Sequence, residues 1–155
     1  MNKLSGLTGK EEDMGLFSKW GSKEKEYAEL DSNSPSAAFL SNLQQNLEPF
    51  VKSVSDPLEI IPSQEAAYIF VGKPPKVFGF VWIQKDGVFN MKKVVAEKGI
   101  PITDYQLLSD ELRDAYTRSQ DAERYSAKLG GKKIIVTPSD SLVKEVESIV
   151  KKLEK

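Results

Sequence analysis

The sequence contains neither cysteine nor histidine among its 155 residues, and these two absences remove whole classes of chemistry. Without cysteine there is no disulfide, no thiolate nucleophile and no thiolate ligand for zinc or an iron–sulfur cluster. Without histidine there is no Ser-His-Asp triad, no imidazole ligand for haem or copper, and no side chain whose unperturbed pKa lies near neutrality. We therefore predict no catalytic residues, no metal site and no cofactor, although enzymes built on lysine or carboxylates would need neither missing residue.

The sequence also lacks a strong excess of one charge and any long hydrophobic run. It has 22 Lys+Arg against 23 Asp+Glu, whereas proteins that bind phosphate backbones usually carry a basic stripe, so we do not expect a nucleic-acid partner. No run of about 18 apolar residues is present to span a bilayer. The first residues are broken by glycines and followed by acids, unlike a secretory signal, and we expect cytoplasmic residence.

Residues 1–33 contain four glycines, more acids than lysines and only scattered apolar positions. Such a composition buries too little surface to stay ordered, so we predict a mobile N-terminal arm and a single domain over residues 34–155. Within the arm, Met14 to Trp20 form a small apolar cluster beside lysines. This cluster leaves open a peripheral membrane adaptor tethered by the arm, although it is shorter than most interfacial helices.

The first predicted helix begins after Ser34 and Pro35, a good cap followed by proline at the first helical position. Its apolar stripe ends near Val54, and we expect Pro49 to kink or split it. Residues 60–62, Ile-Ile-Pro, are interpreted as an extended linker.

The rest of the chain alternates between short apolar runs and helical patterns. We expect a hairpin from residues 66–71 and 77–83, an optional short strand at 88–89, a helix over 91–98, a long helix from Thr103 to Gly130, a strand over 133–137, and a last helix after Pro138. This order predicts an α+β fold with a mixed three- or four-stranded sheet and about four helices. The last strand follows a helical crossover and is expected to lie parallel to a hairpin strand.

The hairpin carries the main candidate site, because alternation along its strands separates the side chains into two faces. The aromatic face consists of Tyr68, Phe70, Phe78, Phe80 and Trp82. We expect the first helix to cover it in a three-layer domain, since apolar residues on both faces usually mean a doubly buried sheet. Two alternatives are an interface with a partner or a second copy, and a pocket for a flat or apolar ligand.

Three weaker signals remain. Ser139 and Ser141 lie between a strand and a helix N-terminus, where free N–H groups favour an anion, although Asp140 opposes one and plain capping is the simpler interpretation. The acids of the long helix alternate with arginines and indicate a solvated, ion-paired surface. The densest basic cluster consists of Arg124, Lys128, Lys132 and Lys133.

The function that these patterns favour is a non-catalytic interaction or regulatory module acting through protein–protein contacts or self-association. It would use the aromatic face or the long helix. The main alternative is a small-molecule-binding protein, or an enzyme without His and Cys, with a pocket against Tyr68, Phe80 and Trp82.

Overall fold

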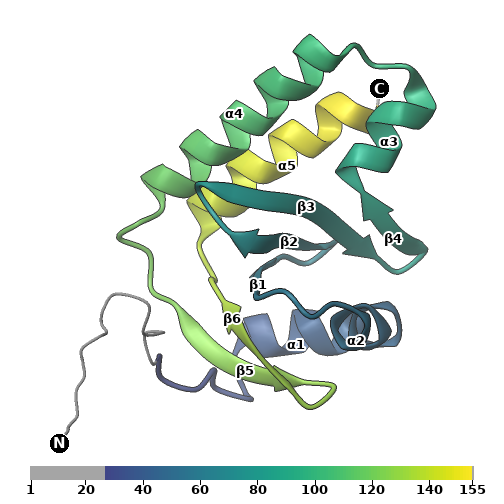
Figure 1. The fold of residues 1–155 in the computed structure, drawn as a ribbon. Coiled ribbons are helices and arrows are strands. Elements are labelled where there is room, and N and C mark those ends of the chain that lie inside the picture. Colours follow the sequence, from purple (N-terminus) through teal and green to yellow (C-terminus); the bar gives the residue numbers. More distant parts are fainter. Residues whose placement is uncertain (1–26, 155) are drawn as a thin grey trace, which may run out of the picture.

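A computed structural model describes residues 27–154 and shows an α+β fold built on one mixed sheet (Figure 1). The helices within this range are α1 (Pro35–Asn42), α2 (Gln44–Ser53), α3 (Met91–Lys98), α4 (Ile102–Arg118) and α5 (Asp140–Glu154). The strands are β1 (Leu58–Pro62), β2 (Ala67–Lys73), β3 (Val77–Gln84), β4 (Gly87–Asn90), β5 (Tyr125–Leu129) and β6 (Lys132–Val136). The α+β class and the mixed sheet are confirmed, while the described chain has six strands rather than three or four, and five helices rather than about four.

The sheet has the strand order β4-β3-β2-β1-β6-β5. The pairs are antiparallel except for β1 with β6, where Glu59 lies opposite Ile135 and Ile60 opposite Val136. Strand β6 is therefore parallel as predicted, but its neighbour is β1 and not a strand of the hairpin. Helices α1 and α2 lie below the sheet in Figure 1, and α3, α4 and α5 lie above it.

The aliphatic face of the sheet packs against α1 and α2. Leu40 and Leu43 at the end of α1, with Leu47 and Val51 of α2, bury themselves against the sheet. The sheet residues of this layer are Leu58, Ile60, Ala67, Ile69, Val81, Ile83, Ile134 and Val136. The first helical segment therefore covers the aliphatic face, and our expectation that it covers the aromatic face is wrong.

The aromatic face packs against α3, α4 and α5 instead. Leu108, Leu112 and Ala115 of α4 belong to the same buried cluster as five α5 residues, Leu142, Val146, Ile149, Val150 and Leu153. Both faces of the sheet are thus buried in three layers, as the two-sided apolar pattern predicts. Helix α5 has a strong apolar stripe at helical spacing, which explains why it takes the central place in this layer.

Three sequence interpretations fail in the middle and at the end of the chain. Residues 58–62 form the central strand β1 and not a linker, since proline closes the strand at its last position. The long helix ends at Arg118 rather than at Gly130. Residues 125–129 form β5 instead, because Gly130 and Gly131 both have positive φ and make the two-residue turn of a hairpin. Helix α4 begins at Ile102, so Thr103 lies inside it rather than capping it.

Other local predictions are confirmed. Ser34 accepts a hydrogen bond from the Ala37 N–H and begins α1. The hairpin forms β2 and β3, and the optional strand forms as β4. Asn90 caps α3, which ends at Gly99. The break in the first helical segment, however, occurs at Leu43, and Pro49 lies within α2.

Residues 1–26 lie outside the described range, so the predicted arm is seen only from Tyr27. Residues 27–30 run beside the edge strand β5, where the Ser126 N–H donates to Ala28 O and the Leu30 N–H donates to Ser126 O, both over 2.8 Å. Glu29 and Ser126 form a parallel β-bridge. The part of the arm that is described therefore contacts the domain.

Candidate ligand-binding site

A buried carboxylate lies at the centre of the sheet. Glu59 belongs to β1, between Leu58 and Ile60, and its side chain is on the same face as Ile61 and the aromatic cluster. The residue is only 5% exposed. A buried charge must be paired and hydrogen-bonded to be tolerated, so Glu59 requires polar partners around it.

Three side chains from distant parts of the chain donate to this carboxylate. The Tyr116 hydroxyl donates to Oε1 over 2.7 Å, and the Thr137 hydroxyl donates to Oε2 over 2.6 Å. The Arg124 Nε donates to the same Oε2 over 2.8 Å and forms an ion pair with it. Both oxygens are therefore engaged, and Glu59 acts as an anchor for α4, the residue after β6 and the segment before β5 rather than as a free base.

Arg124 is held on its other side by the end of α4. Its Nη1 donates to the carbonyl oxygens of Ser119 and Ala122, over 3.1 and 3.2 Å, and its Nη2 contacts the Ser119 hydroxyl at 3.2 Å. The guanidinium lies 5.3 Å from the centre of the Tyr116 ring. Burial acts to lower the pKa of Arg124, but the neighbouring Glu59 outweighs burial and raises the pKa, so the guanidinium keeps its charge.

Tyr116 joins this network to the aromatic core. Its ring meets Phe70 edge to face with the centroids 5.2 Å apart. Burial, followed by the negative charge of Glu59, raises the pKa of the Tyr116 hydroxyl well above its ordinary value, so it remains a donor at neutral pH. The unit of Glu59, Arg124, Tyr116 and Thr137 is thus closed and, because the carboxylate and guanidinium cancel, carries no net charge.

A pocket of about 460 Å³ opens directly over this network. We call it the Glu59 pocket; its walls include Tyr27, Pro57, Glu59, Lys73, Pro74, Tyr116, Ser126, Lys132, Lys133 and Ile135. These residues come from the N-terminal segment at Tyr27, the start of β1 with Pro57 before it, the end of β2 and the β2–β3 turn, the end of α4, and strands β5 and β6. The pocket therefore lies at β1, β6 and the turn end of the hairpin, and none of the five predicted aromatic residues lines it.

A second hollow of about 670 Å³ lies beside residues 27–30. We call it the β5 groove; it is lined by Glu29, Leu30, Leu40, Gln44, Ser126, Lys128 and Leu129, among others. Tyr27, Ser126 and Lys133 line both hollows, so the two hollows are neighbours. The β5 groove combines an edge strand with apolar side chains of α1.

The five predicted aromatic residues come together as one cluster. Tyr68 stacks with Phe80, Phe70 meets Phe78 and Phe80 edge to face, and Trp82 stacks on Phe89. Four of the five are buried beneath helices of the same chain, and Phe78 is half-buried with the Arg113 guanidinium 5.5 Å from its ring centre. Contact with a partner through this face would require α4 and α5 to move away.

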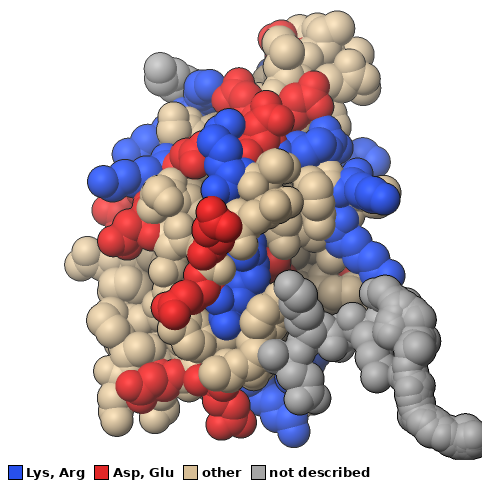
Figure 2. Space-filling model, turned by 90° about the vertical axis from the view of Figure 1, so that its left-hand side faces the viewer, with Lys and Arg blue, Asp and Glu red and all other residues tan. Residues whose placement is uncertain are grey.

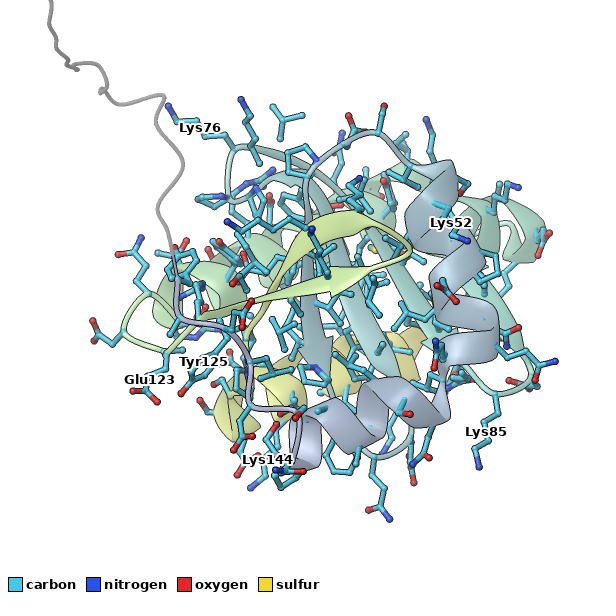
Figure 3. The ribbon with its side chains drawn as sticks, turned by 90° about the horizontal axis from the view of Figure 1, so that it is seen from below. Lys52, Lys76, Lys85, Glu123, Tyr125 and Lys144 are labelled. Carbon is cyan, nitrogen blue, oxygen red and sulfur yellow. The ribbon has the colours of Figure 1, made fainter. Side chains whose placement is uncertain are left out.

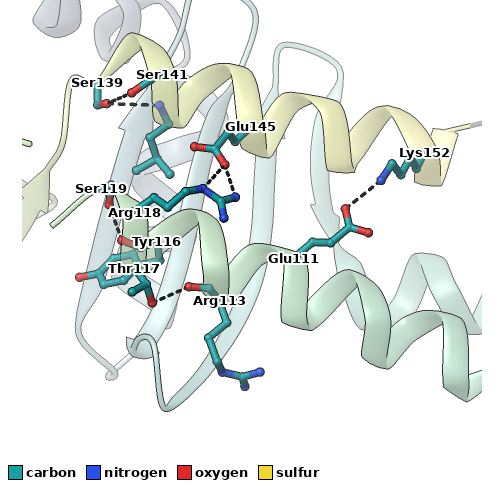
Figure 4. A network of polar contacts seen from close by, with 11 residues as sticks. Glu111, Arg113, Tyr116, Thr117, Arg118, Ser119, Ser139, Ser141, Glu145 and Lys152 are labelled. Carbon is teal, nitrogen blue, oxygen red and sulfur yellow. Dashed lines mark hydrogen bonds and ion pairs between the residues drawn. The ribbon is translucent and has the colours of Figure 1, made fainter.

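The serine pair lies at the start of α5, and the charged surfaces of α4 and α5 carry ion pairs. The Ser139 hydroxyl accepts from the Leu142 N–H at the start of α5 and lies 3.3 Å from the Ser141 hydroxyl (Figure 4). Across α4 and α5, Glu111 pairs with Lys152 at 2.8 Å and Arg118 pairs with Glu145. On the face shown in Figure 2, acidic and basic side chains are interspersed, without one long basic stripe.

The sequence interpretation did not identify Glu59 as a site residue. One signal was available: a single acid inside the apolar run of residues 58–62 must find partners if the run is a buried strand. Tyr116 lies within the predicted long helix, and Arg124 was assigned to a basic cluster. Their partner Thr137 lies 78 residues from Glu59 in the sequence.

Comparison of the chain with protein-family models, with curated proteins and with solved structures finds no match. Among residues 27–154, no helix has both the length and the apolar character needed to cross a membrane. Within the same range, no group of three or more acidic side chains is arranged to hold a metal ion. The apolar cluster of residues 14–20, on which the membrane-adaptor hypothesis depends, lies outside the described residues.

Proposed function

We propose that this protein is a non-catalytic binding module that holds a small molecule in the Glu59 pocket. The observation that carries the proposal is the position of this pocket directly over a buried, fully paired carboxylate. A pocket of about 460 Å³ falls within the range of ordinary ligand sites, about 300 to 1,000 Å³. Cytoplasmic residence belongs to the same proposal.

The walls of the pocket support binding. Tyr27 and Tyr116 offer aromatic surface, and Ile135 and Pro57 offer aliphatic surface, while lysines supply polar contacts. Ligand sites commonly combine apolar walls with a few convergent polar groups. The hydrogen bonds of Glu59 fix Tyr116 against the sheet, so this wall is formed before a ligand arrives and its ordering cost on binding is small.

We propose binding without catalysis because the carboxylate of Glu59 is fully hydrogen-bonded to the protein. Glu59 is the one carboxylate among the pocket walls within residues 27–154, and both of its oxygens accept hydrogen bonds from the protein. A general base needs a free oxygen within reach of a substrate proton. Held in this way, Glu59 contributes shape and rigidity.

The proposal is tested by a metabolite-library thermal-shift screen with a variant that fills the pocket. Ile135 lies beside Glu59 on the pocket floor, so Ile135→Phe adds bulk to the site. Ile102→Phe is the matched control, since Ile102 is 69% exposed on α4 and is not part of the pocket. We expect compounds that stabilise the native chain and Ile102→Phe but not Ile135→Phe. Compounds that stabilise Ile135→Phe as much as the native chain would contradict the proposal.

A second candidate is contact with another protein at the edge strand β5. Its support is the strand-like pairing of Ala28 and Leu30 with Ser126, which shows that this edge accepts an added segment. In the β5–β6 hairpin, Ser126 and Lys128 occupy alternate positions whose backbone groups point away from β6. A partner strand that replaced residues 28–30 would pair with both, in the mode of β-strand addition.

A further inference from the structure

The charges around the Glu59 pocket are unbalanced in favour of cations. Its walls contain three lysines, Lys73, Lys132 and Lys133, and a single acid, Glu59. That acid is already neutralised by Arg124, with which it forms an ion pair of 2.8 Å. The pocket therefore presents uncompensated positive charge to whatever enters it, although the whole chain is close to neutral.

The three lysines differ in what holds them. The Lys132 ammonium donates to the carbonyl oxygens of Val54 and Asp56, each over 2.5 Å, and so fastens the start of β6 to the end of the α2 segment. Lys73 and Lys133 are exposed, and in the described part of the chain neither side chain has a hydrogen bond or an ion pair. These two ammonium groups are the ones available to a ligand.

Lys73 and Lys133 stand on the two strands that flank the start of β1. The Gly72 N–H donates to Pro57 O over 2.9 Å, which places Lys73 beside the start of β1 on the β2 side. Glu59 lies opposite Ile135, which places Lys133 near Pro57 on the β6 side. Two strand spacings, about 10 Å, separate the two backbones, and both lysines line the same pocket.

The remaining walls define the rest of the ligand. Tyr27 and Tyr116 provide ring surfaces, and Pro57, Pro74 and Ile135 are apolar. An inorganic anion alone would leave these surfaces in contact with water. An aromatic or other flat apolar body would bury them, in the way that ligand pockets usually use such walls.

We propose that the Glu59 pocket binds a small molecule with a flat apolar body and one oxyanion group, a carboxylate or a phosphate, which Lys73 and Lys133 hold. This proposal rests on the proposed function of the same pocket. It adds the sign of the ligand's charge, the two residues that bind the charged group and the shape of the uncharged part. Phosphate and carboxylate share the recognition chemistry here, because a lysine ammonium acts as a point charge toward either.

The test is a titration of the full ¹⁵N-labelled chain, followed by amide chemical shifts, with four probes. Phenyl phosphate and benzoate carry both parts of the proposed ligand, inorganic phosphate carries only the anion, and benzyl alcohol carries only the ring. The paired variant Lys73→Met/Lys133→Met removes both ammonium groups. Its matched control is Lys76→Met/Lys85→Met, because Figure 3 shows both of these lysines projecting away from the fold.

We expect phenyl phosphate or benzoate to shift the amides around the pocket, with the stronger of the two identifying the oxyanion. Benzyl alcohol and inorganic phosphate should each bind about tenfold more weakly, or worse. The Lys73→Met/Lys133→Met chain should lose a similar factor for the ring anions, while Lys76→Met/Lys85→Met keeps native affinity. Higher salt should also weaken the binding.

Other outcomes separate the two proposals. Binding of benzyl alcohol as tight as that of benzoate, with the Lys73→Met/Lys133→Met chain unchanged, overturns the oxyanion assignment but leaves a ligand pocket. Tight binding of inorganic phosphate alone overturns the flat apolar body. Absence of any shift around the pocket with all four probes, together with a library screen that finds nothing sensitive to Ile135→Phe, overturns the proposed function itself.

Discussion

The hydroxyl of Tyr116, in the last turn of α4, donates to the carboxylate of Glu59, in the central strand, over 2.7 Å. This contact spans 57 residues of sequence and ties the helix that covers the aromatic face to the strand beneath it. It also closes one wall of the Glu59 pocket. The stability of the domain and the shape of its candidate site therefore depend on the same buried groups.

Replacing Glu59 with leucine should destabilise the fold strongly. In Glu59→Leu the Arg124 guanidinium, whose side chain is 9% exposed, keeps its charge but loses its ion-pair partner. Leaving one member of a buried pair unpaired costs about 3 to 5 kcal/mol. We expect a loss in this range in the free energy of unfolding, measured by urea denaturation at neutral pH.

The double variant Glu59→Leu/Arg124→Leu separates charge from packing. Because it removes both members of the pair, it should recover part of the stability that Glu59→Leu loses. Lys152→Met is the control for an ordinary pair, since Lys152 and Glu111 are both about half exposed, and it should cost less than about 1 kcal/mol. A Glu59→Leu loss no larger than that of Lys152→Met would contradict the assigned role of the network.

Alkaline pH should destabilise the protein through its buried tyrosines. Burial is the main cause that raises the pKa of Tyr68 and Tyr116 above the ordinary value of 10.0, and Glu147 and Glu59 add to it, respectively. A group whose pKa is higher in the folded state stabilises the fold fully below its unfolded pKa. That contribution is lost progressively as the pH rises above the unfolded pKa, because the tyrosine of the unfolded chain releases its proton at a lower pH than that of the folded chain. Stability should thus be insensitive to these residues near neutrality and decline above pH 10.0.

The measurement is urea unfolding of native, Tyr116→Phe and Tyr125→Phe chains at several pH values, with tyrosinate absorbance followed in parallel. Tyr116→Phe should remove part of the alkaline decline, at the cost of lower stability at neutral pH. Tyr125→Phe is the control, because the shift of the Tyr125 pKa comes from its hydrogen bond to Glu123 at the surface. Equal alkaline slopes in all three chains would refute the role given to burial.

Much of the fold follows from periodicity in the sequence, and the failures have local causes. The hairpin, its two faces and three of the helices rest on apolar spacing and end signals within a few residues of each other. Strand β1 was missed because Pro62 suggested a linker, although Leu58, Ile60 and Ile61, interrupted only by Glu59, form an apolar run typical of a strand buried on both faces. Strand β5 was missed because the long helix was predicted to continue from Arg118 to Gly130.

The candidate site could not be predicted in the same way. Its polar core joins Glu59, Tyr116, Arg124 and Thr137. These residues are far apart in the sequence, and only tertiary packing brings them together. The aromatic cluster was correctly grouped because its members belong to one hairpin, where alternation decides the face. Which helices cover each face depends on contacts between distant parts of the chain, and the spacing of apolar residues within one segment does not specify those contacts.

The Gly130–Gly131 turn should respond unequally to alanine. Both residues have positive φ, +56° and +79°, a region that costs an L-residue about 1 kcal/mol. A Cβ on Gly130 would also lie 2.7 Å from Lys52 Cγ, whereas nothing lies within 4 Å of a Cβ on Gly131. Gly130→Ala should therefore lower the free energy of unfolding more than Gly131→Ala does. Gly131→Asn should cost least, because asparagine tolerates this backbone region, and the reverse order would show that the turn differs from the one described.

Releasing residues 28–30 should expose the edge of β5 and promote self-association. The Leu30 N–H donates to Ser126 O, so Leu30→Pro removes this donor and frees the backbone of Ser126, next to the already outward-facing Lys128. An unpaired edge strand is a template for pairing with another chain. We expect Leu30→Pro to form dimers or larger species at concentrations where the native chain does not, measured by light scattering after size exclusion.

Leu30→Ala distinguishes the backbone from the side chain in this experiment. It removes the partly buried leucine that packs on the aliphatic core but keeps the N–H that pairs with Ser126. Self-association of Leu30→Pro alone would favour β5 as an interaction edge and strengthen the second candidate function. If Leu30→Ala associates equally, exposed apolar surface is the cause; if neither associates, the edge is protected by other means and strand addition at β5 is contradicted.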